Sequence, residues 1–220
     1  MDVYLETGAK RTFAGAVDWP GWARAGRDPD AALGALLASG PRFAAVLKGT
    51  RLGFRAPSSR EELRVAERLQ GTATTDFGAP DVALPSDEAP IEDRELRRLQ
   101  AILRAAWRTF DTAAAAAEGV ELTKGPRGGG RALEQIVDHV LGADEAYVRS
   151  LGAKIADGEV DDRVRRVRDG ARDALDRTVR EGVEPVGPRG GKRWVPRYFV
   201  RRSAWHVLDH AWEIEDRTTG

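Results

Sequence analysis

The 220-residue chain contains no cysteine, and this absence excludes several kinds of chemistry at once. Disulfides, cysteine-ligated zinc, iron–sulfur clusters and a cysteine nucleophile all require a thiol side chain. Histidine is nearly as scarce, with three residues in the whole chain. A metal site in this protein must therefore use histidine, carboxylate, water or a substrate as ligands.

The chain also lacks long apolar runs and a net charge. No segment approaches the roughly 20 apolar residues that span a bilayer, and residues 1–6 lack the features of a signal peptide. The 35 basic and 35 acidic residues cancel, so no overall positive charge favours nucleic acid or a membrane. A Walker loop, a Gly-x-Ser-x-Gly motif and a dinucleotide fingerprint are absent as well. We therefore expect a cytoplasmic protein with a small-molecule substrate and without a nucleic-acid or membrane partner.

Residues 1–85 are typical of a small mixed α+β domain. Asp28 followed by Pro29 predicts the start of a helix that runs to Ala38 and ends at Gly40-Pro41. Ser59 with Glu62 three residues later predicts a second helix through Leu69. Strands are expected at residues 3–5, 11–17 and 72–77.

Residues 79–91 are rich in proline and aspartate, which predicts a linker between two domains, 1–85 and 86–220. After it the apolar pattern becomes helical. The four expected helices are residues 92–118, 130–154, 158–181 and 196–216. The whole chain is therefore predicted to be α+β, with an all-α four-helix bundle as its C-terminal part.

All three histidines lie in the predicted bundle. His206 and His210 are four residues apart, so they lie one turn apart on one helical face, where they can bind the same metal ion. At about 100° per residue, His139 falls at the edge of the apolar stripe of its own helix, and the pair flanks the apolar arc of the last helix. Such positions line a cleft between helices. The alternative is a chance pair of surface histidines.

Two glycine-rich basic loops precede the histidine-bearing helices, at residues 125–131 and 187–193. Free N–H groups at helix starts favour anions, so the loops are candidates for binding an anionic substrate or cofactor. The candidate residues are Arg127, Arg131, Arg189 and Arg193. The alternative is that proline and glycine end helices here and that arginine keeps the loops hydrated.

The segment Ile136-Val137-Asp138-His139 through Tyr147, together with His206-x-x-x-His210, resembles the DinB/YfiT-like family over about residues 92–217. The resemblance implies a four-helix bundle with a three-histidine site for a divalent metal, most often zinc or nickel. It also implies open coordination positions, which a catalytic metal needs. Glu213 lies on the same helical face as the pair and is the candidate catalytic acid or base. Alternatively, it orients a ligand or pairs with an arginine.

Several members of that family are thiol-dependent transferases or isomerases, and metal-dependent hydrolysis is a further activity that we consider. The chain has 30 arginines against five lysines, a composition that suits a high-GC organism. Mycothiol is common in high-GC Gram-positive bacteria and is therefore the low-molecular-weight thiol that we expect. The alternative function is a non-catalytic, metal-binding stress-response protein.

The N-terminal segment Phe13–Asp28, with the helix start at Pro29, is similar to HicB-like antitoxin domains. The likeness covers about residues 1–45, or residues 1–85 at its widest, and implies a small sheet with helices on one face. It makes an antitoxin-like interaction protein a further alternative. We expect this N-terminal part to pack against the bundle, to form a homodimer or to cover the site. Trp19 and Trp22 beside Gly21 are either an exposed docking tip or packed turn residues.

Overall fold

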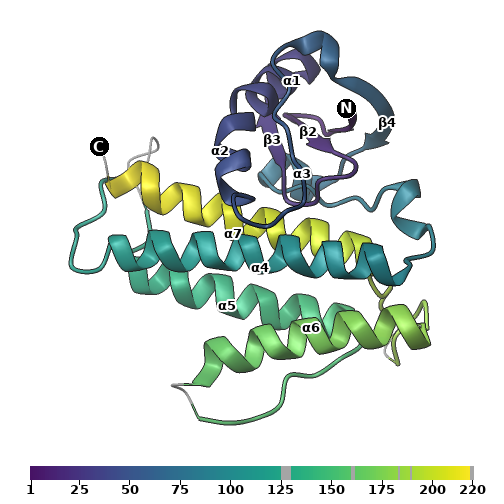
Figure 1. Ribbon diagram of the computed structural model, residues 1–220, viewed down its shortest axis with the longest axis vertical. Coiled ribbons are helices and arrows are strands. Elements are labelled where there is room, and N and C mark those ends of the chain that lie inside the picture. Colours follow the sequence, from purple (N-terminus) through teal and green to yellow (C-terminus); the bar gives the residue numbers. More distant parts are fainter. Residues whose placement is uncertain (125–129, 160–161, 183, 189, 219–220) are drawn as a thin grey trace.

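The computed structural model describes residues 1–124, 130–159, 162–182, 184–188 and 190–218. Within them the fold is α+β, as expected from the sequence: a four-stranded mixed sheet lies on a layer of long helices (Figure 1). The strands are β1 (Asp2–Thr7), β2 (Thr12–Ala16), β3 (Ala23–Gly26) and β4 (Arg64–Gln70). Their order is β3-β2-β1-β4, with β1–β2 and β2–β3 antiparallel and β1–β4 parallel.

The remaining elements follow the chain. Short helices belong to the N-terminal part: α1 (Pro29–Ala38), α2 (Gly40–Val46) and α3 (Ala73–Phe77), with 3-10 turns η1 (Arg60–Glu62) and η2 (Pro85–Glu88). Four long helices follow: α4 (Asp93–Ala116), α5 (Leu133–Ser150), α6 (Arg163–Glu181) and α7 (Pro196–Thr218). In the described part of the chain, no helix combines the length and the apolar character needed to cross a membrane.

The start of α1 has the predicted capping. The Asp28 side chain accepts a hydrogen bond from the Ala31 N–H at 2.8 Å, and Pro29 occupies the first turn, where its missing N–H costs nothing. α1 ends at Ala38, as predicted, and Gly40-Pro41 then begin a second helix, α2. These residues form the first turn of α2, where proline is equally well tolerated.

Two further predictions in the N-terminal part are wrong. Residues 64–70 form β4, an edge strand paired with β1, and not the helix expected from Ser59 and Glu62. Glu62 does cap locally, accepting from the Ser58 N–H at 3.0 Å, but this stabilises only the η1 turn. Residues 73–77 form α3 in place of a strand, because the Thr72 side chain accepts from the Thr74 N–H at 3.0 Å and starts a helical turn.

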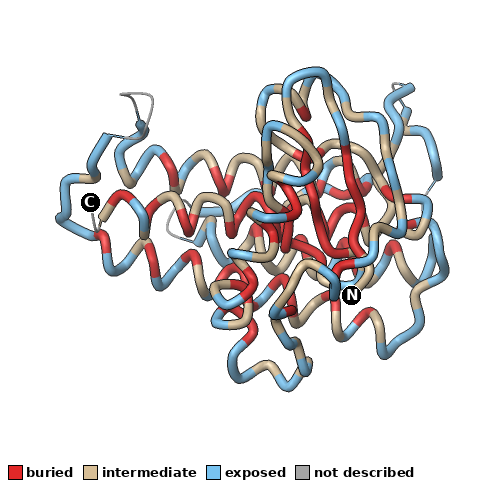
Figure 2. The backbone as a smooth tube through the Cα atoms, turned by 90° about the horizontal axis from the view of Figure 1, so that it is seen from above, coloured by how far each residue is buried: buried red, intermediate tan, exposed pale blue. Residues whose placement is uncertain are grey.

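The long helices pack side by side, and α7 lies between them and the sheet (Figure 1). α7 packs along α4 and contacts α5, while α5 contacts α6. β1, β2 and the inward faces of the helices are buried, whereas the outer faces of the helices and the edge strand β4 are exposed or half-buried (Figure 2). α7 is consequently covered by protein over most of its surface, which explains its long run of buried residues.

The sheet packs on α7 through aromatic and small side chains. Phe13 of β2 meets Trp205 of α7 edge to face, with ring centroids 5.7 Å apart. Gly21 has a φ of +94°, and a Cβ atom there would lie 2.8 Å from the Ala204 side chain, so this turn requires glycine. Trp22 is buried and donates its ring N–H to the Ser39 hydroxyl at 2.9 Å. Trp22 is therefore a packed turn residue and not an exposed docking tip.

Residues 79–91 are tied into the structure at several points. Leu84 and Asp87 are both buried. The Arg201 guanidinium of α7 donates to Asp87 at 2.8 Å, and Tyr198 donates its hydroxyl to the Asp81 carbonyl at 2.9 Å. The segment predicted as a linker is thus hydrogen-bonded to α7 at Asp81 and at Asp87.

Candidate metal centre

The three histidines come from two helices that pack against each other. On α5, Ile136 and Val140 are buried in the core, and His139 lies at the edge of this stripe with intermediate exposure, as predicted. On α7, His206 is 7% exposed, and the side chain of His210 is 11% exposed. Because α5 and α7 are in contact, the edge positions of both helices face the same interhelical seam.

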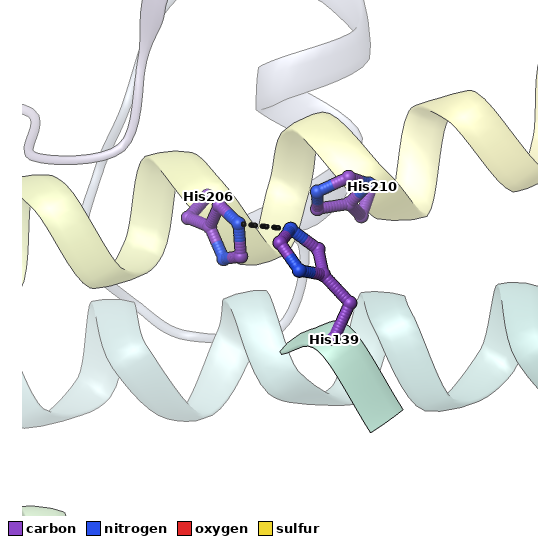
Figure 3. A group of neighbouring side chains, drawn as sticks. All are labelled: His139, His206 and His210. Atoms are coloured by element: carbon purple, nitrogen blue, oxygen red, sulfur yellow. Dashed lines mark hydrogen bonds between the residues drawn. The ribbon is translucent and has the colours of Figure 1, made fainter. Parts of the chain in front are cut away.

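In this seam the three imidazoles converge (Figure 3). The Nε2 atoms of His139 and His206 are 3.2 Å apart, and one possible ligand nitrogen from each ring lies within 4.8 Å of the others. The His210 ring centroid is 4.9 Å from that of His139 and 4.7 Å from that of His206. Two nitrogens that each bind a tetrahedral zinc ion at 2.0–2.1 Å lie about 3.3 Å apart. The donor set therefore fits one divalent metal.

The protonation states also suit a metal site. Burial lowers the pKa of His206 well below its usual value, and the neighbouring His210 and Arg202 side chains add smaller contributions in the same direction. Burial likewise lowers the pKa of His139, with a further contribution from His210. Both rings are therefore neutral at pH 7, which is the form that binds metals. Nδ1 of His206 is buried without a hydrogen-bond partner in the described part of the chain.

His210 is oriented by a chain of polar contacts. Its Nδ1 lies 2.7 Å from a Glu213 carboxylate oxygen. The other Glu213 oxygen accepts from Arg217 at 2.9 Å, and Arg217 donates to the Thr123 carbonyl at 2.7 Å. With Nδ1–H donating to Glu213, the lone pair of His210 is on Nε2, the remaining ligand atom. A carboxylate that holds a metal-binding histidine in this way is common at protein metal sites.

The hydrogen bond from His210 lowers the pKa of Glu213, so this side chain is ionised at neutral pH. An ionised carboxylate that already accepts from His210 and Arg217 is suited to positioning the imidazole. The catalytic acid or base role stays a prediction from the sequence.

Replacing Glu213 with alanine should weaken zinc binding about 10- to 100-fold, because His210 loses the acceptor that sets its tautomer and orientation. Glu213→Gln should weaken binding less, since its amide oxygen still accepts from Nδ1–H. Competition with a chromogenic zinc chelator measures both constants. Equal zinc affinity in the alanine variant and the wild type would contradict this positioning role.

Four arginines were predicted to bind an anion, and the two that the structure describes lie at different distances from the triad. Arg131 is exposed, and its charge contributes to lowering the pKa of both His139 and His206, which places it on the side of the triad. Arg193 lies against Gly152, beyond the C-terminal end of α5 and about 20 Å along the helix direction from His139 at 1.5 Å per residue. Arg127 and Arg189 lie outside the described residues.

Two residues at the seam, Tyr147 and Arg202, were not predicted from the sequence to belong to the site. Tyr147 of α5 lies with its ring centroid 5.8 Å from that of His206. The guanidinium carbon of Arg202 on α7 lies 5.3 Å from the Tyr147 ring centroid. Helical spacing was the available signal, because Tyr147 is eight residues after His139 and Arg202 is four residues before His206.

Comparison of the chain with family models, curated proteins and solved structures finds no match. The likeness to the DinB/YfiT-like family therefore rests on the motifs in the sequence. The chemistry of the site has to be argued from its own residues.

Proposed function

We propose that the protein is a metal-dependent enzyme of the DinB/YfiT-like type that acts on a small molecule. His139, His206 and His210 would hold one divalent cation, with zinc or nickel as the best candidates for three imidazole ligands. The observation that carries this proposal is the convergence of all three histidines of the chain, with possible ligand atoms within 4.8 Å of one another.

Three protein ligands leave coordination positions for a substrate or water. When bound, such a metal acts as a Lewis acid and lowers the pKa of a coordinated thiol or water. We propose a low-molecular-weight thiol of the mycothiol type as co-substrate, which makes the enzyme an S-transferase or an isomerase. Metal-dependent hydrolysis is the variant in which water takes the place of the thiol.

The residues of the chain have separate tasks in this proposal. His139 and His206 are kept neutral by burial and present nitrogen lone pairs. Glu213 orients His210. For the sheet, whose sequence is similar to HicB-like domains, we propose a supporting role, since it packs on α7 through the Phe13–Trp205 contact next to His206.

The proposal is tested by elemental analysis of the purified protein, comparing wild type with the His206→Ala/His210→Ala double variant. We expect about one equivalent of zinc or nickel in the wild type and almost none in the variant, which keeps a single imidazole. The loaded protein is then assayed for consumption of mycothiol, bacillithiol or glutathione with small electrophiles. Equal metal content in both proteins would overturn the proposed site. Metal binding without any turnover, thiol-dependent or hydrolytic, would favour the non-catalytic alternative.

A further inference from the structure

Arg202 is a cation in the α5–α7 seam for which the described residues supply no acidic partner. It lies one helical turn before His206, about 6 Å along the axis of α7. Its Nη1 atom is buried and has no hydrogen-bond partner within the described part of the chain. Leaving a buried donor unsatisfied is costly, and the cost is higher for a charged group. Such an atom needs an explanation, and Arg202 as a whole is half-buried, so the side chain is not sealed from solvent.

Other arginines of α7 are paired, which makes Arg202 unusual on this helix. Arg201 binds Asp87 at 2.8 Å, and Arg217 binds Glu213 at 2.9 Å. Asp209, a carboxylate whose pKa responds to the charge of Arg202, is engaged by Arg24 at 3.2 Å. Among the described residues, no acidic side chain forms an ion pair with Arg202.

Aromatic rings surround Arg202. The guanidinium carbon lies 5.3 Å from the Tyr147 ring centroid and 4.9 Å from that of Trp205. Aromatic faces stabilise a cation but cannot accept hydrogen bonds as an anion does. The Tyr147 ring also contacts His206, so it connects Arg202 to the triad. Arg202 and the candidate metal ligands thus belong to one continuous site.

We propose that Arg202 binds a carboxylate group of the substrate beside the metal centre, an inference that rests on the proposed function. A planar guanidinium matches a carboxylate, which can accept two parallel hydrogen bonds from it. One unpaired guanidinium balances the single charge of a carboxylate. The half-buried Tyr147 ring, which lies between Arg202 and His206, suits a flat, unsaturated or aromatic acid. The substrate class is therefore a small aromatic or unsaturated carboxylic acid.

Calorimetric titration of the zinc-loaded protein with benzoate tests this inference, with benzamide as the uncharged control ligand. We expect the wild type to bind benzoate and Arg202→Gln to bind it about 10- to 100-fold more weakly, the loss typical of a charge-assisted hydrogen bond. Arg202→Lys retains the charge without the planar fork and should show an intermediate loss. Arg97→Gln, a change at an exposed arginine of α4, should bind benzoate like the wild type.

The zinc content of each variant, together with the same titration on zinc-free protein, separates this inference from the proposed function. Arg202→Gln should contain as much zinc as the wild type, because Arg202 is not a ligand. Benzoate binding that depends on Arg202 in a protein that takes up no zinc would support the carboxylate site and count against the metal centre. The inference is overturned if the wild type does not bind benzoate, if benzamide binds equally well, or if neither Arg202 variant weakens binding. If Arg202→Gln fails to fold, the lysine variant decides.

Discussion

Zinc should raise the midpoint of thermal unfolding of the wild-type protein by about 5–10 °C and should raise that of His139→Ala far less. A ligand present at 100 times its dissociation constant stabilises the folded state by about 2.7 kcal/mol, and in a chain of this size 1 kcal/mol corresponds to about 2–4 °C. His139 supplies the ligand on α5, whereas His206 and His210 both belong to α7. Without His139 the remaining pair no longer ties the two helices together.

Calorimetry in zinc and in chelator measures both shifts. Glu134→Ala is a suitable control, because Glu134 is an exposed residue of the same helix and lies outside the triad. It should retain the full shift. An equal response to zinc in wild type and His139→Ala would show that the metal does not bridge α5 and α7.

Replacing Arg201 with methionine should lower the free energy of unfolding by about 3–5 kcal/mol, the range found when one partner of a buried ion pair is removed. Arg201 and Asp87 are 4% and 2% exposed. The guanidinium also donates to the carbonyls of Ala16 and Val17 at 2.8 and 3.0 Å. These contacts join α7, η2 and the end of β2, so the substitution leaves a carboxylate and two carbonyls buried without their cation.

Urea unfolding measures this loss, which is a large part of the roughly 5–15 kcal/mol that stabilises a typical domain. Arg180→Met is the matched control, since Arg180 pairs with Asp176 on the exposed face of α6 and should matter little. The double variant Arg201→Met/Asp87→Leu should recover part of the loss because no uncompensated charge stays buried. A change in Arg201→Met as small as that in the control would contradict the role assigned to this pair.

The outcome for the N-terminal part shows where local patterns fail. Short apolar segments predicted β1 and β2, and the Asp28-Pro29 pair predicted the start of α1, because each signal acts within a few residues. β4 was missed because its pairing partner, β1, lies about 60 residues earlier. Tertiary pairing therefore outweighed the local preference for a helix. At residues 72–77 the threonines favoured a strand, but one capping hydrogen bond to Thr72 favoured a helical turn.

For the candidate site, the sequence by itself determined the ligand types and their helical positions. The absence of cysteine left histidine as the main nitrogen or sulfur ligand, and the spacing of His206 and His210 placed both on one face of a helix. Only the tertiary structure decided that His139, 67 residues away, meets this pair. It also decided that Arg202 lies beside Tyr147 and forms no ion pair with the acidic residues that the structure describes. Helical periodicity depends on the backbone geometry of neighbouring residues, whereas contact between α5 and α7 depends on how whole helices pack against each other.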